Sequence, residues 1–242
     1  VRTESKDFIH WSVPQLIIVP DDDDPGQIHG ASVFFLHGIY LAMLQRLDFG
    51  GFDRGGSGNM PAELASSRDG FHWHRPFRDK MFLPVTGKGD SFDAGCLWTS
   101  STSIHLPEEI RFYYGAYPGW NSDLEKDSTG IGLATLHRDR FVAIEPQDDN
   151  AQVTLKPIEL STLNRLTVNA DAAGGEVRVE LLTAEGYRVA GFTRERSIAI
   201  TGDSLQHQVK WKEKTMANLA PGRYQLRVHL GNAKLFALTV ER

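Results

Sequence analysis

The chain has 242 residues, of which 40% are hydrophobic and 24% charged, and this composition is ordinary for a globular protein and excludes a disordered one. A net charge of −5, with basic residues scattered along the chain, argues against nucleic acid or an anionic membrane as the main partner. The chain opens on Val-Arg-Thr-Glu-Ser-Lys-Asp, which is no signal peptide, and no apolar run reaches the roughly 18–20 residues of a membrane span. The single Cys96 excludes an internal disulfide and, since it lies in an apolar run, is expected in the core.

An internal repeat organises the first part of the chain. Ser5–Ser12 matches Ser67–His74 at an offset of 62 residues, with Ser, a basic residue, Asp, His and Trp in register. A weaker third copy begins near Ile131. Two apolar, strand-like stretches follow each of the first two copies: Ile28–Phe34 and Gly38–Leu44, then Phe92–Trp98 and Glu109–Gly115. A period in the sixties built from short strands predicts four-stranded blades of a β-propeller, with no helix of useful length before residue 150.

Residues 1 to about 148 are therefore expected to form a partial propeller of two to three blades. Propellers close with typically four to eight blades. An open one exposes sheet edges and apolar faces, which favour association. The sequence thus predicts a homo-oligomer in which copies cover the open edges.

The second part follows a polar break at residues 146–151 and is predicted to be a β-sandwich over residues 152–242. Its expected strands alternate polar and apolar residues, as a sheet with one buried face requires. They are Arg165–Asn169, Glu176–Leu181, Gln206–Trp211, Tyr224–Leu230 and Lys234–Val240. Ala173–Glu176 and Pro221–Arg223 are expected to form turns between strands.

Several stretches of both parts resemble one family of bacterial proteins, which is related to glycoside hydrolase families 32 and 43. The stretches are Leu64–Trp73, Gly89–Gly95, Ile110–Gly115, Gly130–Leu136, Val168–Glu180, Ile200–Ser204 and Leu230–Leu235. The resemblance implies a five-bladed propeller followed by a β-sandwich, of which this chain looks like the C-terminal part. It also implies action on an oligo- or polysaccharide, at a funnel on the propeller axis lined by the first residues of the innermost strands.

Glycoside hydrolysis usually needs two carboxylates that flank the bond, and Asp93 and Glu63 are the candidates. The repeat aligns Asp93 with His29 on successive inner strands, so both are expected to point toward the axis. Burial beside Phe92 is expected to raise the pKa of Asp93 and suit it to acid or base work. The alternatives are that Asp93 caps a turn or ties blades together, and that Glu63 is a surface residue on an edge.

Three further residues are candidates for substrate binding. His29 would position a sugar hydroxyl or help to hold a metal, or else is a satisfied core histidine. Tyr117 and Trp120, expected on a loop, would stack on the apolar faces of sugar rings, whereas Trp98 is expected in the core.

The acidic residues of the repeat and of one loop have structural interpretations. Asp7 and Asp69 are expected to cap hairpin turns, while Trp11 and Trp73 pack between blades. Asp21–Asp24 is expected to be a solvated loop, with Ca²⁺ binding as the alternative because carboxylate oxygens are hard ligands. No other cofactor is predicted.

The leading hypothesis is a glycosidase that uses carboxylates at the propeller axis. One alternative is a carbohydrate-binding protein without catalysis. The other is an esterase-type hydrolase, for which Gly55–Gly58 resembles a nucleophile elbow only loosely, because Asn59 breaks the Gly-x-Ser-x-Gly spacing.

Overall fold

The computed structural model describes residues 1–24, 26–48, 58–87, 91–119 and 129–241. These residues form antiparallel β-sheets, and the one helical element among them is a 3₁₀ turn at Met216–Asn218, so the prediction of an all-β protein is confirmed. The chain divides into two compact units. The first consists of Val1–Leu106 with Ile110–Thr135, and the second of Pro107–Glu109 with Leu136–Arg242. No helix in the described part of the chain is long and apolar enough to cross a membrane.

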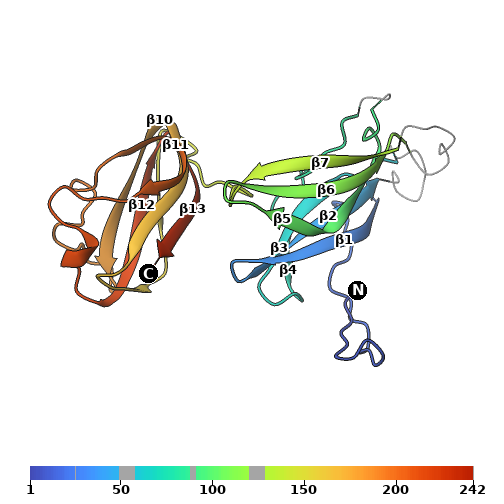
Figure 1. The fold of residues 1–242 in the computed structure, drawn as a ribbon, viewed down its shortest axis with the longest axis horizontal. Coiled ribbons are helices and arrows are strands. Elements are labelled where there is room, and N and C mark those ends of the chain that lie inside the picture. Colours follow the sequence, from blue (N-terminus) through green and yellow to red (C-terminus); the bar gives the residue numbers. More distant parts are fainter. Residues whose placement is uncertain (25, 49–57, 88–90, 120–128, 242) are drawn as a thin grey trace. The chain divides into compact units, whose positions relative to one another are not determined.

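The first sheet of the first unit has four strands in chain order, each antiparallel to the next (Figure 1). They are β1 (Gly26–Leu36), β2 (Ile39–Asp48), β3 (Ala62–Ser67) and β4 (Trp73–His74). A two-residue turn joins β1 to β2, and its residues His37 and Gly38 both have positive φ, as the tight hairpin turn with a matching twist requires.

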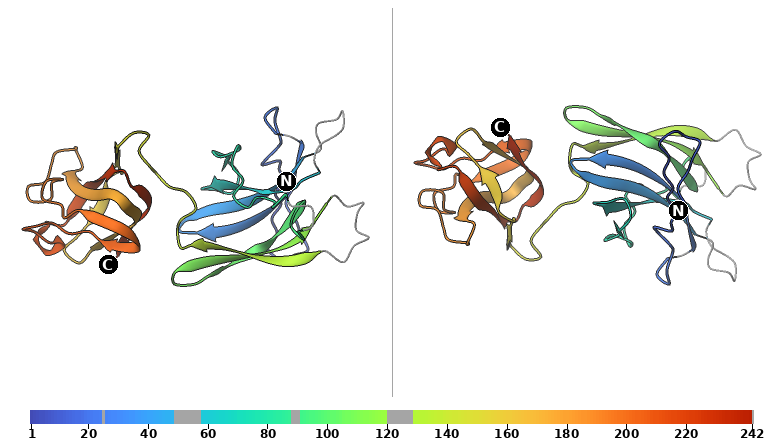
Figure 2. Two further views of the ribbon diagram at one scale, coloured as in Figure 1. Left: turned by 90° about the horizontal axis from the view of Figure 1, so that it is seen from above. Right: turned by 90° about the horizontal axis from the view of Figure 1, so that it is seen from below.

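The second sheet repeats this order with β5 (Cys96–His105), β6 (Glu109–Tyr117) and β7 (Gly130–His137). The two sheets lie side by side in Figures 1 and 2. Ser32 in β1 bonds to the hydroxyl of Thr99 in β5 at 2.7 Å, and the rings of Phe34 and Phe112 lie 5.8 Å apart. The predicted strand beginning at Phe92 starts four residues late, at Cys96, which is buried as expected.

The repeated Asp residues cap turns, as predicted. Asp69 accepts the backbone N–H groups of Phe71 and His72 at 2.8 Å each, and its other oxygen lies 2.7 Å from Nδ1 of His72. Asp7 makes the same three contacts one repeat earlier, to Ile9 and His10. These bonds hold the pKa of both Asp carboxyls below the ordinary value, with the bond to the His side chain as the largest cause.

The two tryptophans of the repeat differ from each other. Trp73 packs against a small core of Ala42, Leu44 and Ala65 in β2 and β3. Trp11 is 51% exposed and makes an edge-to-face contact with Phe8, so the prediction that it packs between sheets is wrong. The residues around Trp73 supply a sheet for it to cover, and the described residues around Trp11 form only a short hairpin.

The second unit is organised around one long strand, β10 (Arg165–Thr183). The first half of β10 pairs with β11 (Ile200–Gln208) and β13 (Lys234–Glu241), and the second half pairs with β12 (Gly222–Gly231). Two short strands, β8 (Asn150–Thr154) and β9 (Ile158–Leu160), extend the sheet beyond β12.

The turn predicted at Ala173–Glu176 is wrong, because β10 continues through it. A Cβ atom at Gly175 would lie 1.9 Å from the carbonyl oxygen of Gly231, and one at Gly174 would lie 3.0 Å from the Asn232 amide. The glycines therefore permit a close approach of two backbones rather than a reversal of the chain.

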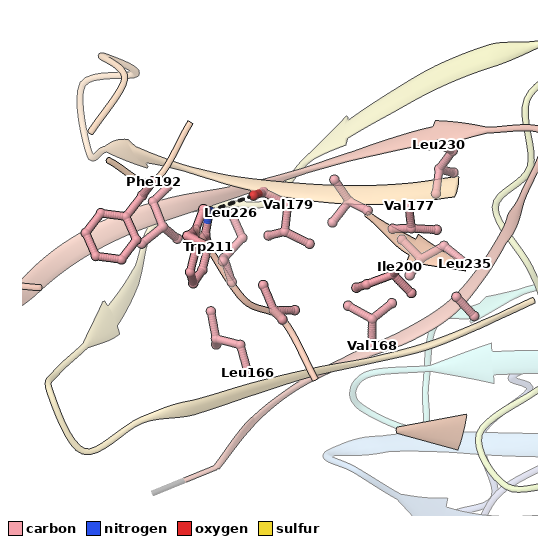
Figure 3. Close-up of a cluster of buried hydrophobic side chains, with 14 of the residues drawn as sticks. Leu166, Val168, Val177, Val179, Phe192, Ile200, Trp211, Leu226, Leu230 and Leu235 are labelled. Atoms are coloured by element: carbon pink, nitrogen blue, oxygen red, sulfur yellow. Dashed lines mark hydrogen bonds between the residues drawn. The ribbon is translucent and has the colours of Figure 1, made fainter. Parts of the chain in front are cut away.

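A hydrophobic cluster fills the second unit, and Figure 3 shows its side chains converging from β10, β11, β12 and β13. Trp211 donates its indole N–H to the Val179 carbonyl oxygen at 3.0 Å and packs edge-to-face on Phe192 at 5.0 Å (Figure 3). The strand predicted at Gln206–Trp211 is displaced, since β11 ends at Gln208 and Trp211 follows it as a core side chain.

Candidate functional site

The candidate site lies in the first unit, at the end where β1 and β5 begin. The prediction that Asp93 lies on an inner strand, at the position equivalent to His29, is wrong, because Asp93 lies in the turn before β5. In the corresponding turn before β1, the position equivalent to Asp93 is Asp23, and Asp24 is the next residue. The alignment from sequence failed because the turn motif repeats after 62 residues, whereas β1 and β5 start 70 residues apart, at Gly26 and Cys96.

Asp93 is a buried carboxylate held by three hydroxyl groups. Thr86 and Ser91 donate to one oxygen at 2.9 and 2.5 Å, and Tyr114 donates to the other at 3.0 Å. Burial raises the pKa of Asp93, but the hydrogen bonds from Ser91, Thr86 and Tyr114 together outweigh it, so the pKa lies below its ordinary value. The expected raised pKa is therefore wrong, and Asp93 is held as an anion. The same contact and burial raise the pKa of Tyr114, with burial as the larger cause.

Glu63 in β3 is not a surface residue, because its side chain is 0% exposed. Arg75 donates to both of its oxygens, from Nε at 2.9 Å and from Nη2 at 2.8 Å. Nη1 of Arg46 lies 3.1 Å from the second oxygen. Arg75 also holds Asp24 with two bonds, at 2.8 and 2.6 Å, and Arg46 lies 3.2 Å from the same carboxylate. We call Asp24, Arg46, Glu63 and Arg75 the ion-pair cluster.

The ion-pair cluster carries two negative and two positive charges in a space closed to water. The Asp24 side chain is only 2% exposed, and the hydrogen bond from Arg75 is the main cause that lowers its pKa to about 2. The same contacts raise the pKa of Arg75. One nitrogen, Nε of Arg46, has no hydrogen-bond partner among the described residues. Because Arg75 keeps the Asp24 carboxylate ionised, Asp24 is not suited to donate a proton.

The loop Asp21–Asp24 is thus not uniformly solvated. Asp21, Asp22 and Asp23 are exposed, as predicted, but Asp24 is drawn into the ion-pair cluster. Asp21 binds Arg78 at 2.5 Å. In the ranges that the structure describes, no three His, Cys, Asp or Glu side chains gather as metal ligands would.

His29 occupies a β-bulge, since Ile28 pairs with Arg46 and Gly30 pairs with the adjacent residue Gln45. A bulge re-aims the extra side chain. The exposed His29 ring meets the Trp98 ring of β5 edge-to-face, with centroids 5.1 Å apart and an interplanar angle of 84°. Trp98 is 38% exposed, so its predicted core position is wrong. The residue across from it on β6 is Gly115, which has no side chain to cover the ring.

Two tyrosines share the sheet face of Trp98. Tyr117 is the last residue of β6 rather than a loop residue, and it packs partly against Leu47, Met60 and Cys96. Side chains alternate along a strand, so Tyr113, Gly115 and Tyr117 lie on one face. Tyr113 is exposed. We call His29, Trp98, Tyr113 and Tyr117 the aromatic face.

The predicted Trp120 lies outside the described residues, as do the first three residues of Gly55–Gly58. Among the described candidates, the structure brings His29 to the aromatic face with Tyr117. It places Glu63 and Asp93 in two different clusters, one held by arginines and one by hydroxyls.

Sequence reasoning missed four residues of this end of the unit: Asp24, Arg46, Arg75 and Tyr113. The Arg75 position carried one signal, because it lies two residues after the repeated tryptophan. Tyr113 lies inside the predicted strand Glu109–Gly115, and nothing in the sequence indicates that its side chain is exposed. No known family model matches the chain, and no curated protein matches it significantly.

Proposed function

We propose that the first unit binds carbohydrate on the aromatic face. The observation that carries the proposal is the exposed pair of His29 and Trp98, which the bulge in β1 and the glycine opposite Trp98 leave open. Sugar rings present apolar C–H faces that stack on indole and phenol rings, while an imidazole at the edge bonds to a hydroxyl. Tyr113 and Tyr117 extend this surface along β6.

The state of the carboxylates favours binding over cleavage. Cleavage of a glycosidic bond needs one carboxyl group that is protonated at working pH. Asp24 has a pKa of about 2 and Asp93 a pKa below its ordinary value, while Glu63 is bound by two arginines. Each of these groups already has partners in the chain.

We also propose that β1–β4 and β5–β7 are successive blades of a β-propeller and that the second unit is a β-sandwich. Support comes from the same antiparallel strand order in both sheets and from the recurrence of the Asp-capped turn. The resemblance to glycosidase-related proteins points the same way.

Affinity electrophoresis through gels that contain soluble polysaccharides tests the proposal, followed by calorimetric titration with the oligosaccharide of the best ligand. Trp98→Ala should weaken binding about 10-fold or more, since loss of one stacking contact costs about 1.4 kcal/mol. Trp11→Ala is the matched control, because Trp11 is also exposed but lies in the N-terminal hairpin. Retention of full affinity by Trp98→Ala, or retardation by no polysaccharide at all, would refute the proposal.

Glycoside hydrolysis is the second candidate, and one observation favours it. Asp24 and Asp93 lie in the turns that precede β1 and β5, where the family resemblance implies the catalytic funnel. Release of reducing sugar that disappears in a folded Asp93→Asn or Glu63→Gln variant would establish it. Unchanged turnover in both variants would remove these residues from any mechanism.

A further inference from the structure

One face of the second unit is polar across three neighbouring strands. In β10, β12 and β8, the residues directly opposite one another share a face, and alternate residues belong to it. The opposite face of the same strands carries Val177, Val179 and Val228, which belong to the core. The polar side is formed by Asn150, Gln152, Thr154, Glu176, Arg178, Glu180, Arg227 and His229.

A cavity of about 510 Å³ opens on this polar face. Binding sites for small molecules commonly have volumes of about 300–1,000 Å³. Apart from Ala151, Leu230 and Gly231, the lining residues are polar or charged: Asn150, Gln152, Glu176, Arg178, Arg194 and His229. Such a lining suits a ligand that makes hydrogen bonds on several sides.

Two of the lining side chains are held in place by carboxylates. Glu180 is 0% exposed and lies 3.0 Å from Nε2 of His229, which fixes the orientation of that imidazole. Arg227 lies 3.3 Å from the same oxygen and offsets its charge. Glu176 holds Arg178 through two bonds of 2.7 and 2.9 Å. Groups fixed in advance lose little freedom when a ligand binds.

The charges of the lining residues do not cancel. The guanidinium of Arg178 is neutralised by Glu176, whereas that of Arg194 is exposed, and its backbone N–H is the group that bonds to Glu180. With two guanidiniums and one carboxylate, the lining carries one net positive charge. Asn150 and Gln152 add amides that both donate and accept hydrogen bonds.

We propose that this cavity binds a saccharide unit that carries a carboxylate, such as a hexuronate residue of an acidic polysaccharide. Arg194 takes the carboxylate, because a guanidinium pairs with it in a planar, two-bond geometry. The amides and Glu176 take the ring hydroxyls, which are donors and acceptors at once. The site is separate from the aromatic face and does not depend on it.

The test is calorimetric titration of the whole chain with trigalacturonate at fixed ionic strength. Binding should weaken at least 10-fold in Arg194→Ala and also fall in Gln152→Ala, two exposed positions whose change leaves the core intact. Arg196→Ala is the matched control, since Arg196 lies in the same loop but pairs with Glu213 and does not line the cavity. Its affinity should equal that of the unchanged protein.

The proposal would be overturned by no binding of trigalacturonate, by an equal loss of affinity in Arg196→Ala, or by equally tight binding of the neutral trisaccharide maltotriose. Full competition by acetate at the concentration of the sugar carboxylate would also overturn it, because the cavity would then recognise a simple anion. Trp98→Ala separates the two sites: trigalacturonate binding that survives it belongs to the second unit, and binding that it abolishes overturns the assignment to this cavity.

Discussion

The two copies of the Asp-capped turn have the same internal hydrogen bonds, but the tryptophan of one is packed on a sheet and that of the other is exposed. Asp7 and Asp69 each accept two backbone N–H groups and contact a histidine at 2.7 Å. The turn even forms with Phe8 at the position of Gly70, although both need a positive φ. Yet Trp73 packs on a sheet, and Trp11 is exposed. Local sequence therefore sets the turn, whereas burial depends on strands elsewhere in the chain.

The largest expected difference in stability between the two copies comes from substituting the residue two places after each tryptophan. Arg75 enters the ion-pair cluster, whereas Val13 at the matching place is 81% exposed. Arg75→Ala should lower the stability of the first sheet by about 3–5 kcal/mol, because it leaves Asp24 and Glu63 buried without their main partner. Val13→Ala should have almost no effect. Hydrogen-exchange mass spectrometry of peptides from β2 and β3 measures both, and an equal effect of the two changes would contradict the cluster's role.

Substitution of the two tryptophans should give a smaller difference in stability. Trp73→Ala should cost about 2–3 kcal/mol, since the ring covers Ala42, Leu44 and Ala65 but remains partly exposed. Trp11→Ala should cost well under about 1 kcal/mol, as its ring contacts Phe8 at the surface. The same exchange measurement compares them. A large effect of Trp11→Ala on β2 and β3 would mean that the hairpin supports the sheet.

Acid should weaken the first unit through Asp24. Its pKa falls from 3.8 to about 2 on folding, so the contribution of the ionised group is complete above 3.8 and is lost as the pH falls toward 2. The contribution is about 2 kcal/mol by the size of that shift. Urea unfolding followed by fluorescence measures it in a Trp211→Phe background, where the remaining tryptophans lie in the first unit.

The control for this acid effect is Asp24→Asn. The stability difference between the parent and Asp24→Asn should shrink from about 2 kcal/mol at pH 7 toward zero near pH 2. A difference that stays constant over this range would mean that ionisation of Asp24 does not stabilise the sheet.

The parts of the fold that sequence could predict are those fixed by short-range patterns. Strands β12 and β13 follow from alternation, and the turn caps follow from the repeated Ser-x-Asp. The Gly174–Gly175 pair led to the wrong prediction of a turn, because a turn and a close approach of two backbones both favour glycine.

The site was predicted less well, because its partners come from distant positions. Asp24 meets Arg46 and Arg75 only when the four strands of the first sheet assemble, and the residues next to Asp24 in the chain give no indication of this contact. Trp98 has the apolar neighbours of a core residue, and its exposure depends on Gly115 across the sheet. Candidate residues could be named from sequence, but not their protonation or their neighbours.

The long strand β10 has a consequence for synthesis of the protein on the ribosome. Its partners β11, β12 and β13 all follow it, and the paired residues lie 23 to 76 positions apart, from Val177 with Ile200 to Arg165 with Glu241. Until then its apolar side chains, which later form the centre of the core, lack their native cover. The second unit therefore completes its fold only after nearly all of its chain has left the exit tunnel, and this interval is when a chaperone would protect it.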